Sequence, residues 1–138
     1  MARIIFKKVI EEALILAEAL DAEVTVLTVV GEYVFTPRVS VHFAVDSWEL
    51  IHKQFKKEAE EIVEKAAQPF KDKGIKVKKE VVVGPQSPAD VICEMAASGD
   101  YNLVILGSRG LKGVKGAFLG SVSSKVVHCS GNNVLIIK

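Results

Sequence analysis

Short runs of β-branched and other apolar residues alternate with longer segments of helical periodicity, and this alternation restricts the possible fold more than any other feature of the chain. Strands are predicted at 2–6, 23–30, 76–84, 102–107 and 132–138, and helices at 7–20, 46–74, 87–98 and 120–130. Gly74 is expected to end the second of these helices in a left-handed conformation. Regular alternation favours parallel strands joined by right-handed helical crossovers. The sequence therefore predicts an α/β fold of the Rossmann-like kind, with an open five-stranded parallel sheet sandwiched by helices.

Length and charge exclude several classes of protein. The chain has 138 residues, which predicts a single domain over 1–138 with one hydrophobic core. Its formal net charge is +1, so no broad basic surface for nucleic acid or an anionic membrane is expected. No apolar run approaches the length of a membrane span. We expect a cytoplasmic protein that binds neither nucleic acid nor membrane.

The cysteines and histidines suggest no catalytic or metal chemistry. Cys93 and Cys129 lie far apart in the sequence and match no metal or redox spacing, so both are expected to be buried and reduced. His42, His52 and His128 share no ligand spacing, and no metal site is predicted. No nucleophile–base pair or carboxylate pair can be assembled, so no catalytic residue is predicted.

The segment GSRGLKGVKGAFLGS, residues 107–121, follows a buried strand and contains five glycines and no acidic residue. In open α/β sheets, ligands bind beyond the carboxyl ends of the strands. Glycines there allow backbone N–H groups to approach a phosphate that a Cβ atom would block. Gly107 and Gly110 can turn the chain off the strand, and Arg109, Lys112 and Lys115 add positive potential.

The end of this segment opens a helix whose first amides are free. Gly120, Ser121, Val122 and Ser123 occupy that position, where the helix dipole and the serine hydroxyls favour an anion. The Walker pattern is absent because Val114 follows Gly113, and the dinucleotide pattern is absent as well. The alternative is a flexible, lysine-rich loop followed by an ordinary capped helix.

The spacing Gly107-x2-Gly110-x9-Gly120-Ser121 resembles the ATP-binding motif of the universal stress protein family. The stretches NLVILGSRG, LGSVSSKVVHCSGNNVLIIK and VVVGPQSPADVI are similar to the strands and helices around that motif. The resemblance implies an adenine-nucleotide alpha hydrolase-like sheet of five parallel strands, a homodimer, and ATP as the ligand, with or without Mg²⁺.

The same resemblance implies roles for individual residues. The phosphates and ribose would be held by Gly107, Gly110, Gly120 and the segment Ser121, Val122 and Ser123. Val29, at the end of the second predicted strand, would contact adenine. The dimer would form through the last strand, at Val134, Leu135, Ile136 and Ile137, because a terminal strand exposes an unpaired edge.

The start of the chain departs from the family. There, the first strand runs into a loop with Pro-x-Asp, whose acid contacts the nucleotide. Here ARIIF meets KKVIEEAL directly, although βα connections normally take about 2–6 residues. Either the chain lacks this loop, or it is interrupted between about Phe6 and Val9. We predict the interruption, which would place the Cα atoms of Phe6 and Lys7 well beyond the ~3.8 Å of bonded neighbours.

Three interpretations of function follow. The first is an ATP-binding regulatory dimer of the stress response, acting on an unknown protein partner, with slow ATP hydrolysis left open. The second is a dimeric interaction module of the same fold that has lost ATP binding. The third is an enzyme of another α/β family that uses the same anion site.

Overall fold

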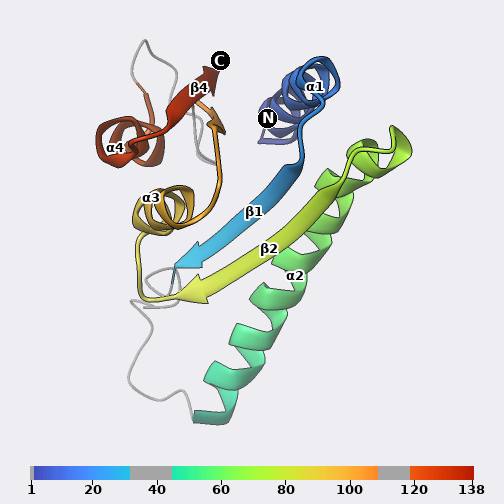
Figure 1. The fold of residues 1–138 in the computed structure, drawn as a ribbon. Coiled ribbons are helices and arrows are strands. Elements are labelled where there is room, and N and C mark those ends of the chain that lie inside the picture. Colours follow the sequence, from blue (N-terminus) through green and yellow to red (C-terminus); the bar gives the residue numbers. More distant parts are fainter. Residues whose placement is uncertain (1, 32–44, 109–118) are drawn as a thin grey trace. The chain divides into compact units, whose positions relative to one another are not determined.

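The computed structural model describes residues 2–31, 45–108 and 119–138, which belong to two compact units (Figure 1). One unit comprises Met1–Ala22 with Pro88–Lys138, and the other comprises Glu23–Ser87. We call them the split unit and the central unit and describe each by itself. A single domain over 1–138 stays a prediction.

The first element of the split unit is a helix, α1, which runs over Ala2–Leu20. The predicted strand at 2–6 is therefore wrong, and so is the predicted interruption after Phe6, because the helix passes through it without a break. No glycine, proline or capping residue separates the two segments. Extending an existing helix fixes one residue per hydrogen bond formed, whereas a separate strand would need a turn that the sequence does not supply.

The central unit contains two parallel strands, β1 over Val24–Gly31 and β2 over Val77–Gly84. They pair in register from Val24 opposite Val77 to Gly31 opposite Gly84. Both predicted strands are thus confirmed to within one residue. The helix α2, Val45–Asp72, connects them and packs against both (Figure 1).

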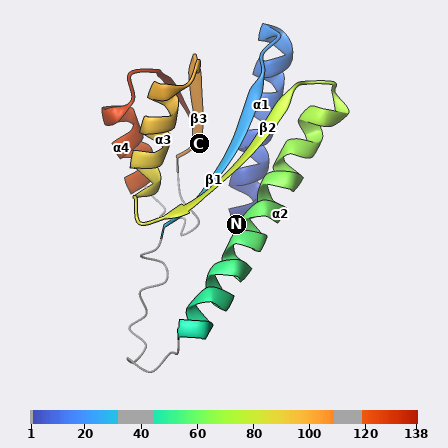
Figure 2. The ribbon, with the colours of Figure 1, turned by 60° about the horizontal axis from the view of Figure 1, so that its bottom comes forward.

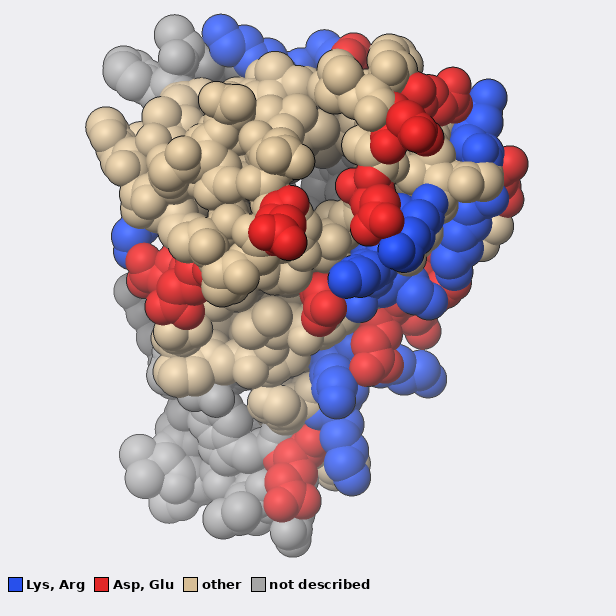
Figure 3. All heavy atoms as spheres, in the orientation of Figure 1, with Lys and Arg blue, Asp and Glu red and all other residues tan. Residues whose placement is uncertain are grey.

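One face of α2 supplies the buried core of the central unit. The buried residues recur at helical spacing: Ala59, Val63, Ala66, Ala67 and Phe70. The opposite face is charged. On the side of the molecule shown in Figure 3, lysines intermix with acidic side chains over α2, as expected for a solvated amphipathic helix.

The end of α2 is fixed by a left-handed glycine. Gly74 has φ of 71°, and its amide donates to the carbonyl of Lys71 at 3.0 Å. The amide of Ile75 donates to the carbonyl of Phe70 at 2.9 Å, which completes a Schellman-type cap. The prediction that Gly74 ends the helix in this conformation is confirmed.

An ion-pair cluster ties α2 to β2 on the exposed surface. Glu64 accepts a hydrogen bond from Lys79 of β2, and another from Lys71 at 2.9 Å. These bonds, that of Lys79 first, lower the pKa of Glu64 to about 2, and the bond to Glu64 raises the pKa of Lys79. Lys71 and Lys79 are therefore both paired with the same carboxylate.

The split unit contains four further elements: α3 over Pro88–Ser98, β3 over Leu103–Gly107, α4 over Ser121–Cys129 and β4 over Asn133–Ile137. The two strands are parallel, with Leu103 opposite Asn133. In Figures 1 and 2, α1 lies on one side of this pair, and α3 and α4 lie together on the other.

The α/β class is confirmed, but the five-stranded sheet is not. Four of the five predicted strands are present in the described residues, as one parallel pair in each unit. The fifth is replaced by the first turns of α1. No helix in the described ranges is both long and apolar enough to cross a membrane.

Phe70 is the largest side chain buried in the central unit, at 1% exposure. We predict that Phe70→Ala lowers the free energy of unfolding by about 3–5 kcal/mol, because it removes buried contacts and leaves a cavity. Ile62→Ala, on the same helix at 44% exposure, is the matched control and should cost less than about 1 kcal/mol. Urea denaturation followed by circular dichroism measures both. Equal losses would show that α2 does not pack through this face.

Candidate functional site: the carboxyl end of β3 and the start of α4

Backbone hydrogen bonds bring the two halves of the glycine motif together. The amide of Ser108, just after β3, donates to the carbonyl of Ile137 at 2.8 Å. The amide of Gly120, the N-cap of α4, donates to the carbonyl of Ser108 at 2.8 Å. The end of β3 and the start of α4 are therefore neighbours, as the motif predicts for Gly107 and Gly120.

Ser123 connects the same two elements through its side chain. Its hydroxyl donates to the carbonyl of Gly107 at 2.6 Å, and the residue is only 4% exposed. A hydroxyl has one proton to donate, so this proton is committed to the protein. A ligand at this site would meet the amide of Ser123 rather than its O–H donor.

The first turn of α4 carries unpaired backbone donors. Gly120 has no side chain to cap them, and its carbonyl accepts the first helical bond from Ser124 at 2.9 Å. Within the part of the chain that the structure describes, no protein acceptor bonds to the amides of Ser121, Val122 or Ser123. These amides and the positive end of the helix dipole can bind an anion such as a phosphate.

The described lysine of α4 is already paired. Lys125 pairs with Asp90 of α3 at 2.7 Å, so its charge is balanced within the protein. Four residues of the predicted site lie outside the described residues: Arg109, Gly110, Lys112 and Lys115. Among the described residues, the free amides of the first turn of α4 and the exposed Ser121 remain as donors for an anion.

Val29 belongs to the central unit and lies near the end of β1, opposite Val82 of β2. It is half-buried. Its position at the carboxyl end of a parallel strand is the one predicted from the sequence. Its contact with adenine stays a prediction.

The cysteines differ from the prediction. Cys93 of α3 and Cys129 of α4 form a disulfide with a Cα–Cα distance of 6.1 Å, so the expectation of two reduced thiols is wrong. No sequence pattern indicates this pair, because the residues are 36 positions apart and match no motif. The packing of α3 on α4 places them within bonding range. Among the described residues, no group of three or more His, Cys, Asp or Glu could hold a metal ion.

In this chain a parallel strand leads through a glycine-rich segment to a helix whose first amides are free. These features define a class of α/β proteins suited to phosphate ligands. The chain belongs to the universal stress protein family, whose model matches residues 7–138. The match begins within α1, after the segment wrongly predicted as a strand.

Individual relatives agree with this assignment. The chain is 34% identical to universal stress protein YxiE of Bacillus subtilis, over 95% of this chain and 89% of the relative. It is 32% identical to universal stress protein MJ0531 of Methanocaldococcus jannaschii, over 93% of this chain and 72% of the relative.

Solved structures share the fold. Protein MJ0577 of Methanocaldococcus jannaschii superposes with a TM-score of 0.76 at 28% identity, covering 93% of this chain and 86% of that one. A universal stress protein from Archaeoglobus fulgidus, solved with dAMP, gives a TM-score of 0.66 at 19% identity, covering 96% and 87%. A further universal stress protein, solved in complex with cAMP, gives a TM-score of 0.62 at 23% identity, covering 96% of this chain and 85% of that one.

We predict that Ser123→Ala lowers the free energy of unfolding by about 1–2 kcal/mol, because the carbonyl of Gly107 loses its donor. Ser121→Ala, two residues earlier and exposed, should change it by less than about 0.5 kcal/mol. Thermal and urea denaturation of the two variants would test this difference. If the two variants are equally stable, the Ser123–Gly107 bond does not hold β3 to α4.

Proposed function

We propose that this protein binds an adenine nucleotide, ATP with or without Mg²⁺, and that its nucleotide state regulates a protein partner in a stress response. The observation that carries the proposal is the set of free amides on Ser121, Val122 and Ser123, located where β3 ends. A phosphate would accept hydrogen bonds from these amides, with Gly110 and Gly120 allowing its approach. Val29 would contact the adenine.

Related structures support the choice of ligand. Two proteins of the same fold were solved with adenine nucleotides, one with cAMP and one with dAMP. The glycine spacing of this chain, from Gly107 to Ser121, resembles the ATP-binding motif of the family. These likenesses support an adenine nucleotide as the ligand, and the helix terminus independently supports a preference for an anion.

The strength of the described donors sets a scale for the affinity. Hydrogen bonds to a charged group contribute about 1.5–3 kcal/mol each, so three amides supply roughly 4.5–9 kcal/mol. That range corresponds to dissociation constants from about millimolar to about micromolar before other contacts are added. Contacts to the base and ribose would strengthen binding beyond what these amides supply.

One observation favours the alternative, an interaction module of the same fold without ATP. Because residues 2–6 are helical and continue directly into 7–20, they supply neither a first strand nor the loop that would carry an acidic nucleotide contact. A ligand that lacks this contact loses part of its ribose or base recognition. The alternative therefore predicts an intact fold with no measurable affinity for adenine nucleotides.

We predict that Gly120→Val reduces ATP affinity at least about tenfold, because a branched side chain would occupy the approach of the phosphate. The backbone of Gly120 is extended, with φ of −61° and ψ of 163°, so valine fits it without strain. Gly131→Ala is the control, since a Cβ there meets nothing within 4 Å and the residue lies past the other end of α4. Isothermal titration with ATP and AMP, with and without Mg²⁺, measures the affinities.

This experiment distinguishes nucleotide binding from the alternative, an interaction module without ATP. Loss of affinity in Gly120→Val, with retention in Gly131→Ala, supports nucleotide binding at α4. Unchanged affinity in both would place the site elsewhere. No binding by the parent protein, together with no nucleotide released by acid from the purified protein, would favour the interaction module.

We further propose that the protein is a cytoplasmic homodimer joined through β4. In the described residues, β4 pairs with β3 along one edge only, so its other edge can accept a second strand. Val134, Leu135, Ile136 and Ile137 would contact the same segment of a second copy. Sedimentation velocity at micromolar concentration should show a dimer, and a monomer alone would contradict this interface.

A further inference from the structure

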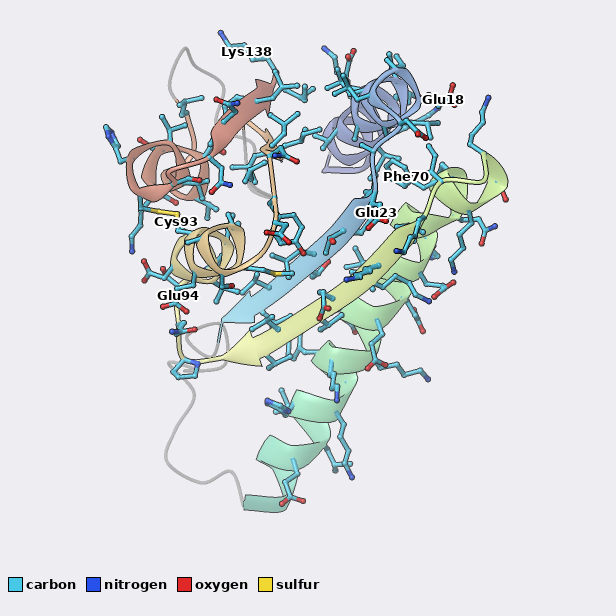
Figure 4. The ribbon with its side chains drawn as sticks, viewed as in Figure 1. Glu18, Glu23, Phe70, Cys93, Glu94 and Lys138 are labelled. Carbon is cyan, nitrogen blue, oxygen red and sulfur yellow. A yellow bond between two sulfur atoms is a disulfide. The ribbon has the colours of Figure 1, made fainter. Side chains whose placement is uncertain are left out.

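The disulfide between Cys93 and Cys129 joins the middle of α3 to the last residue of α4 (Figure 4). The two cysteine residues differ in exposure. Cys129 is exposed and lies at the C-terminal end of α4, whereas Cys93 is half-buried within α3. A thiol from solution can therefore reach the sulfur of Cys129 more readily than that of Cys93.

The surroundings suit the reduced form as well as the oxidised one. The Sγ atom of Cys93 lies 4.0 Å from the carbonyl oxygen of Val126, and Sγ of Cys129 lies 4.0 Å from that of Ala89. Reduction would give each sulfur an S–H donor with a backbone acceptor already at hand. Neither thiol would need a new partner.

The contact between α3 and α4 has other supports besides the disulfide. The ion pair of Lys125 with Asp90 spans the same two helices at 2.7 Å. Ala89 and Val91 of α3, and Val126 of α4, are buried. Opening the disulfide should therefore leave the two helices folded and in contact, with the end of α4 less tightly held.

We propose that Cys93–Cys129 is a reversible thiol–disulfide exchange site for low-molecular-weight thiols, with Cys129 as the sulfur attacked. A thiolate forms a bond to Sγ of Cys129, the Sγ–Sγ bond breaks, and its electron pair leaves on Cys93, which takes a proton from water. A second thiolate attacks the small-molecule sulfur of the mixed disulfide and releases Cys129, whose thiolate also takes a proton from water. Overall, two small thiols are oxidised to their disulfide and the protein gains two S–H groups.

Because the disulfide lies at the end of α4, its reduction would affect how firmly this helix is held. The helix α4 is held near its start by the hydrogen bond from Ser123 to Gly107 and at its end by the disulfide. Its free amides lie at the first of these ends. Reduction frees the second end, so the amides become less preorganised for a phosphate. This coupling rests on the proposed nucleotide binding; the exchange itself does not.

The exchange is tested on the wild-type protein in glutathione buffers of varied reduced-to-oxidised ratio. Thiols are trapped with a maleimide under native conditions and counted by intact mass. We expect both cysteines to be labelled together as the ratio rises, to be protected again when oxidised glutathione is restored, and the helical circular dichroism to be retained. Labelling only in denaturant, or reduction that unfolds the protein, would overturn the proposal.

Two matched variants identify the sulfur that is attacked. Cys93→Ser leaves the exposed Cys129, and Cys129→Ser leaves the half-buried Cys93. With oxidised glutathione as the probe, the Cys129 thiol should form its adduct at least about tenfold faster than the Cys93 thiol. Equal rates, or a faster Cys93, would contradict the assignment.

The coupling is tested by titrating ATP into the oxidised and the reduced wild-type protein, with affinity expected to fall at least about fivefold on reduction. If the exchange is reversible but neither form binds ATP, the exchange site stands and the proposed function fails. If ATP binds but the disulfide does not exchange, the proposed function stands and this inference fails. Equal affinities with reversible exchange would overturn the coupling alone.

Discussion

The hydrogen bond from the Ser123 hydroxyl to the carbonyl of Gly107 joins two elements that are 16 residues apart in the sequence. The position of α4 beside β3 in the split unit depends on this contact. It sets the first turn of α4 beside the end of β3, next to the Ser108 carbonyl that accepts from Gly120. Because Ser123 uses its proton for this bond, its hydroxyl cannot also donate to a ligand, whereas its backbone amide has no acceptor among the described residues. A residue predicted to bind ligand through its hydroxyl is thus primarily the support of the site.

The central unit depends on a different constraint, the burial of one helical face against two strands. Phe70 and the small residues before it occupy that face, while the charged residues of α2 lie in solvent and form ion pairs with β2. The helix lies between the two parallel strands in the chain and packs against both, so these elements form a parallel βαβ motif. Val29, for which a contact with adenine is proposed, lies near the end of β1 in this unit.

Local sequence patterns correctly predicted those helices and strands whose boundaries depend on neighbouring residues in the sequence. Runs of β-branched residues indicated β1 and β2, and the left-handed glycine indicated the end of α2 at Gly74. The strand predicted at 2–6 is wrong because apolar composition alone does not make a strand where no turn separates it from a helix. The disulfide was not predicted because no local pattern indicates it: its cysteines become neighbours only when α3 packs on α4. At the candidate site, the end of β3 and the start of α4 are neighbours, whereas ligand binding by Gly107 and Gly120 stays a prediction; the direction of the Ser123 hydroxyl could not be predicted because it depends on a tertiary contact.

The short helix α4 combines three roles in nine residues. Val126 is fully buried, the first amides are free to bind an anion, and Cys129 closes the disulfide. A helix of this length is marginal in isolation, so its position is set by tertiary contacts rather than by its own propensity. When one end of such a helix is released, the other end is also held less firmly. The proposed ligand binding at the start of α4 and the proposed thiol exchange at its end would act on the same small element, and this proximity is the physical basis of the proposed link between nucleotide site and redox state.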